Sequence, residues 1–381
     1  MSYTTIPAYS SEVDNWRFIA SPLVENTAPT MVNNMITETE YDLYQFNQSA
    51  ADGEWQNYKA NNFNLTNGQG YLYANAEETN IIFKGTFNED ETKEVELAYD
   101  ANANLAGWNL VGNPLPVSAY ANRSYYVMNE EGTAIEPVAV SMETTIPACT
   151  GVMAKADNVG ETVTFSKTAP RAEANQGVLQ IAVAQADTRS AAMMDKAIVS
   201  FNMGDKLEKY VFNKDNAQLY IPRGKNNYAV VSAEKTGEMP LNFEAKKKGT
   251  YTITVDTELA DMEYLHLIDN LTGDNVDLLT QPAYTFEAKT TDYASRFKLV
   301  FFACGDADGD DDSFAFFNGN VWAIANEGSA TLQVVDMLGH VVSSETINGN
   351  VTFSTNGFSA GVYMMRLMNG EKVKVQKVVV R

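Results

Sequence analysis

The chain has 381 residues, and 45% of them are hydrophobic, a composition that supports packed cores and argues against a disordered polymer. Its length exceeds one ordinary core and favours two or three domains. The formal net charge is −22, and such a chain repels polyphosphate and anionic lipid headgroups, which excludes nucleic acid and membrane surfaces as expected partners.

The start of the chain, residues 1–5, lacks the basic and apolar segments of a secretory signal peptide. No run of 18 apolar residues follows, so we expect no membrane-spanning helix. The two cysteines, Cys149 and Cys304, fall in different expected domains, and this count excludes a scaffold held by disulfides. We expect both to be small buried side chains, and the sequence leaves their pairing open.

Residues 1–169 contain two copies of one strand pattern. Trp16 opens a segment that reads Trp-x-apolar-apolar-small-polar-Pro, and Trp108 opens an equivalent segment. Four matches in the same order predict an internally duplicated all-β domain, in which proline closes the first strand of each copy. The three other pairs of segments are 41–47 with 123–129, 70–76 with 151–156, and 81–86 with 163–168.

The tryptophans of this domain suggest a second interpretation, a platform for sugars or peptides, because flat rings combine apolar faces with polar edges. We expect Trp16 and Trp108 to pack in the core, since they occupy equivalent positions and precede apolar pairs. Trp55 lies in a turn-like context and has no counterpart in the second copy. It is therefore the residue we expect to contact a host or glycan ligand if the domain is an adhesin or carbohydrate-binding module.

Residues 170–176 carry no apolar periodicity and are expected to form a linker. A second β region follows at 177–304, where strands at intervals of 8–12 residues predict a β-sandwich. Residues 270–275 are typical of a hairpin turn, and only residues 190–196 are compatible with a short helical turn. Apolar and polar residues alternate at 179–183, 251–255 and 296–301.

An acidic segment at 305–313 reads Gly-Asp-Ala-Asp-Gly-Asp-Asp-Asp-Ser. Like charges repel each other and keep the chain extended, so we expect a linker. Asp306, Asp308 and Asp310 also resemble the start of a calcium loop, but the twelfth position, which requires glutamate, is Phe317. A weak divalent site is the alternative, and the sequence shows no cofactor motif.

The last segment, 314–381, shows the clearest β pattern. Residues 330–334 alternate, and a turn from Asp336 to Gly339 follows. The later pair Asn369-Gly370 accepts two positive φ values, which a type I′ hairpin needs, and the return strand alternates in phase. The sequence therefore predicts a β-hairpin around Asn369-Gly370.

Three motifs stand out in this segment, and their residues are Leu332, Val334, Asp336, Gly339, Gly361, Tyr363 and the closing segment 376–381 with Lys377. In this order they resemble the type A sorting domain of the type IX (Por) secretion system. The resemblance implies an immunoglobulin-like, seven-stranded sandwich that the secretion machinery recognises. It also implies removal of the domain by a sortase-like peptidase, within the acidic linker, and attachment of the cargo to an outer-membrane lipopolysaccharide. We expect Gly361 to provide a backbone geometry or a close approach that larger residues do not allow.

The upstream segment that begins at Trp108 resembles a phrase found in large surface proteins that carry this sorting domain. The chain is thus expected to be the C-terminal part of an exported bacterial surface protein, attached at the outer membrane, whose upstream domains are stalk or interaction modules.

Catalysis is not expected. His266 and His340 are the only histidines, which argues against catalytic triads and histidine-rich metal sites. His266 lies in an alternating, strand-like segment, where we expect a structural role. Motifs for nucleophilic serine, phosphate-binding loops and zinc helices are absent from the sequence. A glycoside hydrolase needs only two suitably spaced carboxylates, and with 49 acidic residues it stays as an open alternative.

Overall fold

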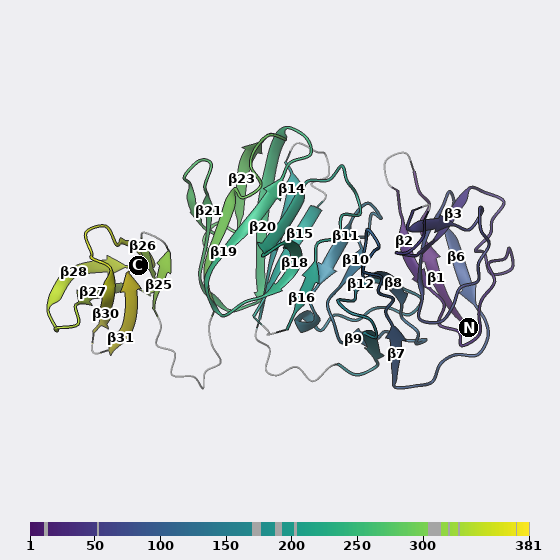
Figure 1. Ribbon diagram of the computed structural model, residues 1–381, viewed down its shortest axis with the longest axis horizontal. Helices are drawn as coiled ribbons and strands as arrows, with labels where there is room; N and C mark the ends of the chain where they lie inside the picture. The colour runs from purple at the N-terminus through teal and green to yellow at the C-terminus, as the bar shows by residue number, and fades with distance from the viewer. Residues whose placement is uncertain are drawn as a thin grey trace.

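The computed structural model describes residues 1–10, 14–51, 53–169, 177–186, 193–201, 204–303, 314–318, 321–326, 328–370 and 372–380. The described part of the chain is almost entirely β, and its single helical element is the short 3-10 turn η1 (Val140–Met142). The β domains follow one another along the longest axis of the molecule, with the N-terminus at one end and the C-terminal strands at the other (Figure 1). The predicted all-β class is therefore confirmed.

The first domain repeats one arrangement of strands. In its first half a four-stranded sheet has the order β2-β5-β3-β4, and in its second half the corresponding strands have the order β8-β12-β10-β11. The outer strands also correspond, because β1 pairs with β6 and β7 pairs with β13. The two halves therefore share one strand order. The strands are β1 (Ser2–Ile6), β2 (Arg17–Ala20), β3 (Tyr41–Phe46), β4 (Trp55–Asn57), β5 (Gly70–Asn75), β6 (Thr79–Phe83), β7 (Thr92–Glu96), β8 (Trp108–Gly112), β9 (Tyr120–Ala121), β10 (Tyr125–Met128), β11 (Ile135–Val138), β12 (Gly151–Lys155) and β13 (Thr162–Ser166).

The two halves meet through equivalent residues. Ile19 of the first half forms a β-bridge with Thr150 of the second. Their counterparts in the repeat, Val111 and Gln69, bridge each other in the same way. Such reciprocal contacts are the mark of an isologous interface. The approach is close, because a Cβ added at Gly70 would lie 2.7 Å from the carbonyl oxygen of Val111. Glycine is thus required there for the two backbones to meet.

The second domain folds a long, strongly twisted sheet around one core. The strand order is β22-β21-β24-β19-β17-β18-β15-β14-β20-β23, and β16 pairs with β18. Buried side chains from both ends of this path share one hydrophobic cluster, as the predicted sandwich requires. The strands are β14 (Val178–Gln185), β15 (Met193–Ser200), β16 (Lys206–Glu208), β17 (Gln218–Arg223), β18 (Asn226–Ser232), β19 (Thr236–Glu244), β20 (Gly249–Leu259), β21 (Met262–Asp269), β22 (Asn275–Asp277), β23 (Ala283–Ala288) and β24 (Phe297–Ala303).

Two local predictions in this domain have different outcomes. The turn after Asp269 is confirmed, since β21 ends there and β22 begins at Asn275. The helical turn at 190–196 is wrong over its described residues, because Met193 begins strand β15 and Lys196 pairs with Ala182. Pairing with β14 outweighs the local preference of the Ala-Met sequence, since strand formation depends strongly on tertiary context.

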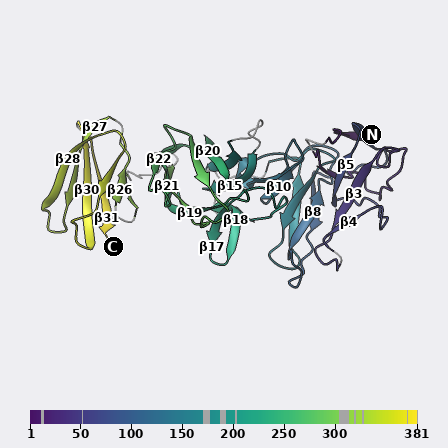
Figure 2. The ribbon, with the colours of Figure 1, turned by 90° about the horizontal axis from the view of Figure 1, so that it is seen from above.

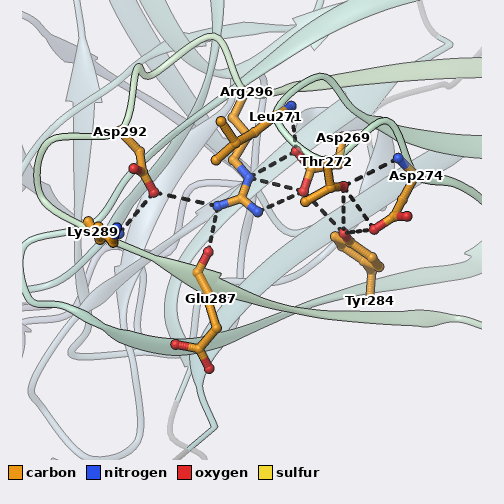
Figure 3. Close-up of polar contacts among 9 residues, drawn as sticks. All are labelled: Asp269, Leu271, Thr272, Asp274, Tyr284, Glu287, Lys289, Asp292 and Arg296. Carbon is orange, nitrogen blue, oxygen red and sulfur yellow. Dashed lines mark hydrogen bonds and ion pairs between the residues drawn. The ribbon is translucent and has the colours of Figure 1, made fainter.

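A buried ion pair ties the end of β21 to the start of β24 (Figure 3). Arg296 and Asp269 are 2% and 1% exposed, and Nη2 of the guanidinium donates to Oδ2 of the carboxylate at 2.7 Å. Nη1 donates to the carbonyl oxygen of Glu287 at 2.7 Å, and Oη of Tyr284 donates to Asp269 at 3.1 Å. Burial alone would raise the pKa of Asp269, but the hydrogen bonds from Arg296 and its other neighbours hold this pKa below its ordinary value.

The first two domains share a core rather than meeting at a loose junction. Trp108 and Tyr126 of the first domain belong to the same buried cluster as Ile198 and Tyr210 of the second. Oη of Tyr126 donates to the carbonyl oxygen of Glu208 at 3.2 Å and accepts the N–H of Tyr210 at 3.1 Å. The two domains therefore form one continuous β body, a feature that the sequence did not indicate.

The described residues of the C-terminal domain form seven strands in two sheets, β25-β26-β29 and β28-β27-β30-β31, as predicted. Trp322, Leu332 and Met365 are among the side chains buried between the sheets. The hairpin is confirmed, but Asn369 pairs with Lys372 inside the ladder, so the positive φ at this turn belongs to Gly370 at +62°. The strands are β25 (Ala315–Asn318), β26 (Val321–Ile324), β27 (Ser329–Val335), β28 (Val341–Asn348), β29 (Val351–Ser354), β30 (Gly361–Asn369) and β31 (Lys372–Val380).

Candidate functional site: the C-terminal domain

The turn between β27 and β28 is organised by one carboxylate. Oδ1 of Asp336 accepts the backbone N–H groups of Leu338 and His340, both at 2.9 Å. The bond from the His340 N–H is the main cause of the lowered pKa of Asp336. Gly339 has φ +90°, a conformation that favours glycine. The Asp-x-x-Gly motif is thus a turn whose side chain satisfies its own backbone.

Tyr363 closes one end of the core. Its ring is half-buried and packs edge-on against Phe358, with ring centroids 5.5 Å apart. Trp322, which is fully buried, lies next to both rings, and Oη of Tyr363 donates to the carbonyl oxygen of Ser359 at 2.9 Å. The tyrosine of the Gly-x-Tyr signature therefore fixes the loop that precedes its own strand.

The expectation for Gly361 is wrong. Its φ is not in the left-handed region, and a Cβ added there would meet no atom closer than 3.9 Å. Gly361 begins β30 and pairs with Val380 in an ordinary ladder. Neither backbone conformation nor close packing explains glycine at this position, so any requirement for it comes from outside the domain.

Lys377 lies on β31 directly opposite Met364, and Met364 in turn lies opposite Val335 on β27. Because Asp336 follows Val335 and Tyr363 precedes Met364, the motif residues gather at one end of the four-stranded sheet. Lys377 is exposed, and its position in the strand alternates with buried Val378. The structure thus places Lys377 on the outer face of the sheet.

Gln376 is a residue that the sequence did not single out. Its Oε1 accepts the N–H groups of Phe314 and Ala315 at 2.6 and 2.7 Å, and its Nε2 donates to the carbonyl oxygen of Ala315 at 2.7 Å. One amide side chain on the last strand therefore holds the segment where the domain begins. A side chain that mimics a strand neighbour has no sequence signature, so its role could be found only in three dimensions.

Trp55, the expected ligand contact, lies in strand β4 rather than in a turn. Its half-buried ring packs edge-on against Phe46, with centroids 5.0 Å apart, and against Phe212 of the second domain at 6.3 Å. Trp108 is 4% exposed, and the half-buried Trp16 packs against the same cluster. The Trp55 ring therefore packs both within the first domain and across its boundary with the second.

A pocket of about 400 Å³ opens at the same domain boundary, lined by residues of both domains. Nζ of Lys155 lies 3.0 Å from Oε1 of Glu208, and Lys206 forms an ion pair with Asp157. These pairs cross the boundary and strengthen the attachment of the second domain to the first. The pocket is lined by charged groups of both signs and by polar groups.

The two histidines lie in different domains, His266 on β21 and His340 after the turn at Gly339. His266 stacks on Tyr264 with ring centroids 4.2 Å apart and contacts Asn275, while exposed His340 contacts Asp336. Among the described residues no group of three His, Cys, Asp or Glu side chains could hold a metal ion. The candidate cation ligands Asp306, Asp308 and Asp310 lie outside the described residues, as do the linkers at 170–176 and 305–313 and Cys304.

Among the described residues no helix is long and apolar enough to cross a membrane. A comparison with curated proteins finds no match. One similar solved structure is a "Biofilm associated protein - BSP domain", which is 10% identical and covers 100% of this chain and 96% of its own. Its TM-score of 0.17 is too low to support an argument about fold.

The C-terminal domain does have a family match. The model of the family described as "Secretion system C-terminal sorting domain" matches residues 318–381, which is less than a fifth of the chain. The match covers β26 to β31 and the motif residues described above. The seven-stranded domain at the C-terminus of this chain therefore belongs to the sorting domains of a bacterial secretion system.

Proposed function

We propose that this chain is an exported bacterial surface protein whose last domain is its type IX secretion and anchoring signal. The observation that carries the proposal is the family match over a domain with a core of its own. In this account the secretion machinery recognises the domain, and a sortase-like peptidase removes it within the acidic segment 305–313. The cargo is then attached at the outer membrane.

The upstream domains act as a stalk or interaction module in this account. Their shared core and the ion pairs across their boundary favour a stiff body, since a buried apolar interface resists relative motion of domains. The sorting domain lies at one end of this body and the first domain at the other (Figure 1). Anchoring at the sorting end would hold the first domain away from the membrane.

The test compares the full chain with a chain that ends at residue 303, both expressed behind a signal peptide in a strain with a type IX system. The full chain is expected at the surface, where added protease degrades it in intact cells. The shortened chain is expected in the periplasm. Once purified, it should keep the far-ultraviolet circular dichroism spectrum of a β protein, because the first two domains keep their cores. Equal surface exposure of the two chains would contradict the proposal.

Gly361→Ala separates folding from recognition. Because a Cβ has room at this position, the variant should unfold at the same temperature as the wild type. If the machinery reads this glycine, the variant should accumulate in the periplasm. Export at the wild-type level would show that Gly361 is not part of the signal.

An adhesin or carbohydrate-binding role is the second candidate, and the polar pocket at the domain boundary is the observation that favours it. An array of glycans and host matrix proteins tests this role. Binding that is lost in a variant of a pocket residue, Lys206→Ala, or in Trp55→Ala at an unchanged unfolding temperature, and that is kept in Trp322→Phe, would support it. An array without signal would remove the candidate. We further propose that the chain is not an enzyme; hydrolysis of any member of a polysaccharide panel would overturn this and revive the glycoside hydrolase alternative.

A further inference from the structure

The outer face of the sheet β28-β27-β30-β31 is unusually apolar for a surface exposed to solvent. On β31 the side chains of Val373, Val375 and Val379 are 55%, 46% and 44% exposed. They alternate with residues that face the core, such as Val378 and Val380. Both faces of this strand therefore carry apolar side chains, although only one of them is needed for the core.

The neighbouring strand continues the same face. Met368 lies opposite Val373, and Val362 lies opposite Val379. Their positions alternate with the buried Met365 and Leu367 of β30, so they share the outward side. Contiguous exposed apolar surface of this kind marks an interaction site more often than chance exposure does.

Two cations stand within this apolar face. Arg366 lies opposite Val375, and Lys377 lies opposite Met364. Both are exposed, and neither forms an ion pair within the described part of the chain. Among the outward positions of the four described strands there is no carboxylate. These positions are Thr331, Gln333, Val335, Val341, Ser344, Thr346, Val362, Met364, Arg366, Met368, Val373, Val375, Lys377 and Val379.

The net charge of the sorting domain differs from that of the rest of the chain. Residues 314–381 contain five Lys and Arg against four Asp and Glu, which leaves 22 against 45 in residues 1–313. The sorting domain is thus near neutral on a strongly acidic chain. The sheet β25-β26-β29 lies toward that acidic body, and the outer face lies on the opposite side of the domain (Figure 2).

We propose that this outer face, formed by the outward residues of β30 and β31, is the surface by which the sorting domain docks on a protein of the secretion machinery. The partner surface is apolar at its centre and carries carboxylates opposite Arg366 and Lys377. This inference rests on the proposed function, since the family match is what identifies the reader as a secretion system. Charge complementarity of this kind sets both the specificity and the rate of docking.

Two other occupants fit the observations less well. A second copy packed face to face would bring four cations together without a carboxylate among them, an arrangement that like-charge repulsion disfavours. An anionic lipid surface would attract the two cations but repel residues 1–313, whose net charge is −23 by the counts above. A protein partner avoids both conflicts.

The decisive experiment measures surface export of the full chain carrying Arg366→Glu and Lys377→Glu together. The matched control is Lys372→Glu, which reverses a charge on the same strand at a position on the other face. Because like charges across an interface weaken binding strongly, the double variant should show about a tenfold or greater loss of surface protein. The control should be exported like the wild type, and both variants should keep the wild-type unfolding temperature.

Val375→Thr tests the apolar part without a charge change, and its branched side chain keeps the strand preference. It should lower surface export while leaving unfolding unchanged. Normal export of the double variant overturns the docking proposal but leaves the sorting function standing, whereas failure of the wild type to reach the surface removes the sorting function itself. If the purified chain binds phosphatidylglycerol vesicles and the double variant does not, the face is assigned to lipid and the proposal is overturned. If light scattering shows dimers that the double variant abolishes, the face is assigned to self-association and the proposal is likewise overturned.

Discussion

Replacement of Arg296 by methionine removes the cation from a buried pair and leaves its carboxylate behind. Arg296 and Asp269 are almost fully buried, and Nε of Arg296 also donates to both carboxylate oxygens at 3.0 and 3.1 Å. Breaking a buried pair from one side costs about 3–5 kcal/mol, because no cation is left to offset the remaining buried charge. This loss corresponds to about a hundred-fold to several-thousand-fold increase in the opening constant of the surrounding strands.

Hydrogen exchange followed by mass spectrometry measures this opening directly in β21 and β24. The second domain contains none of the four tryptophans, so fluorescence would report on other parts of the chain. The control is Lys298→Met, two residues further along on β24, which breaks a pair with Glu238 at 3.2 Å whose side chains are 28% and 48% exposed. Exposed pairs contribute about 0–1 kcal/mol, so the control should exchange nearly like the wild type.

The pH dependence has a definite sign. In the wild type the pKa of Asp269 is lowered, so its contribution to stability is complete above the pKa of an unfolded aspartate and is lost as pH falls through the folded pKa. Without Arg296 burial dominates and raises this pKa, so protonation relieves the unpaired charge. The destabilisation should therefore be largest at pH 7 and shrink toward pH 4. A change as small as that of Lys298→Met, or one independent of pH, would refute the assignment of this pair.

Three further predictions concern the upstream domains. Tyr126→Phe leaves the N–H of Tyr210 without its acceptor, and should lower the unfolding free energy by about 1–3 kcal/mol in urea titrations monitored by tryptophan fluorescence; an unchanged midpoint would contradict the shared core. Gly112→Ala places a Cβ 2.6 Å from the carbonyl oxygen of Gln69, and should cost about 1–3 kcal/mol in the same titration, whereas a neutral effect would argue against the close contact of the two halves. Cys149 is buried, and burial raises the pKa of its thiol. In a chain whose other cysteine is replaced by serine, this thiol should react with a thiol reagent only after unfolding. Rapid labelling of the native chain would show that the thiol is exposed.

The strand pattern of this chain could be predicted because it is locally encoded. Alternation identified β14, β20 and β24, and the repeated Trp-x-apolar-apolar segment pointed to two halves whose strand orders agree. The Asp336 turn could also be predicted, since its side chain bonds to backbone only two and four residues away. Interactions over such distances leave a motif in the sequence.

The contacts that were missed join residues far apart in the chain. Asp269 and Arg296 are 27 residues apart, and Tyr126 and Tyr210 are 84 apart. A charge or a tyrosine in a β pattern does not reveal its partner, because pairing depends on how the sheets fold over each other. The prediction for Gly361 failed in another way. A glycine within a motif suggested a positive φ or a close approach, and the backbone there has neither.

The apolar outer face of the sorting domain is visible in the sequence as an excess of valine, which simple alternation of apolar and polar residues does not explain. Residues 373–380 place valine in both phases of the strand, where a half-buried strand needs it in only one. That excess became interpretable only when the structure showed which phase faces the core.

The central claim is that the last domain is sufficient as an export signal. The most direct measurement is the surface level of an unrelated folded passenger fused to residues 305–381, with its own signal peptide, in a strain that has a type IX system. The passenger should reach the cell surface, and it should remain in the periplasm when residues 377–381 are removed, because Val378 and Val380 complete the core of the domain. Retention of the intact fusion in the periplasm, or equal export of both fusions, would contradict the account.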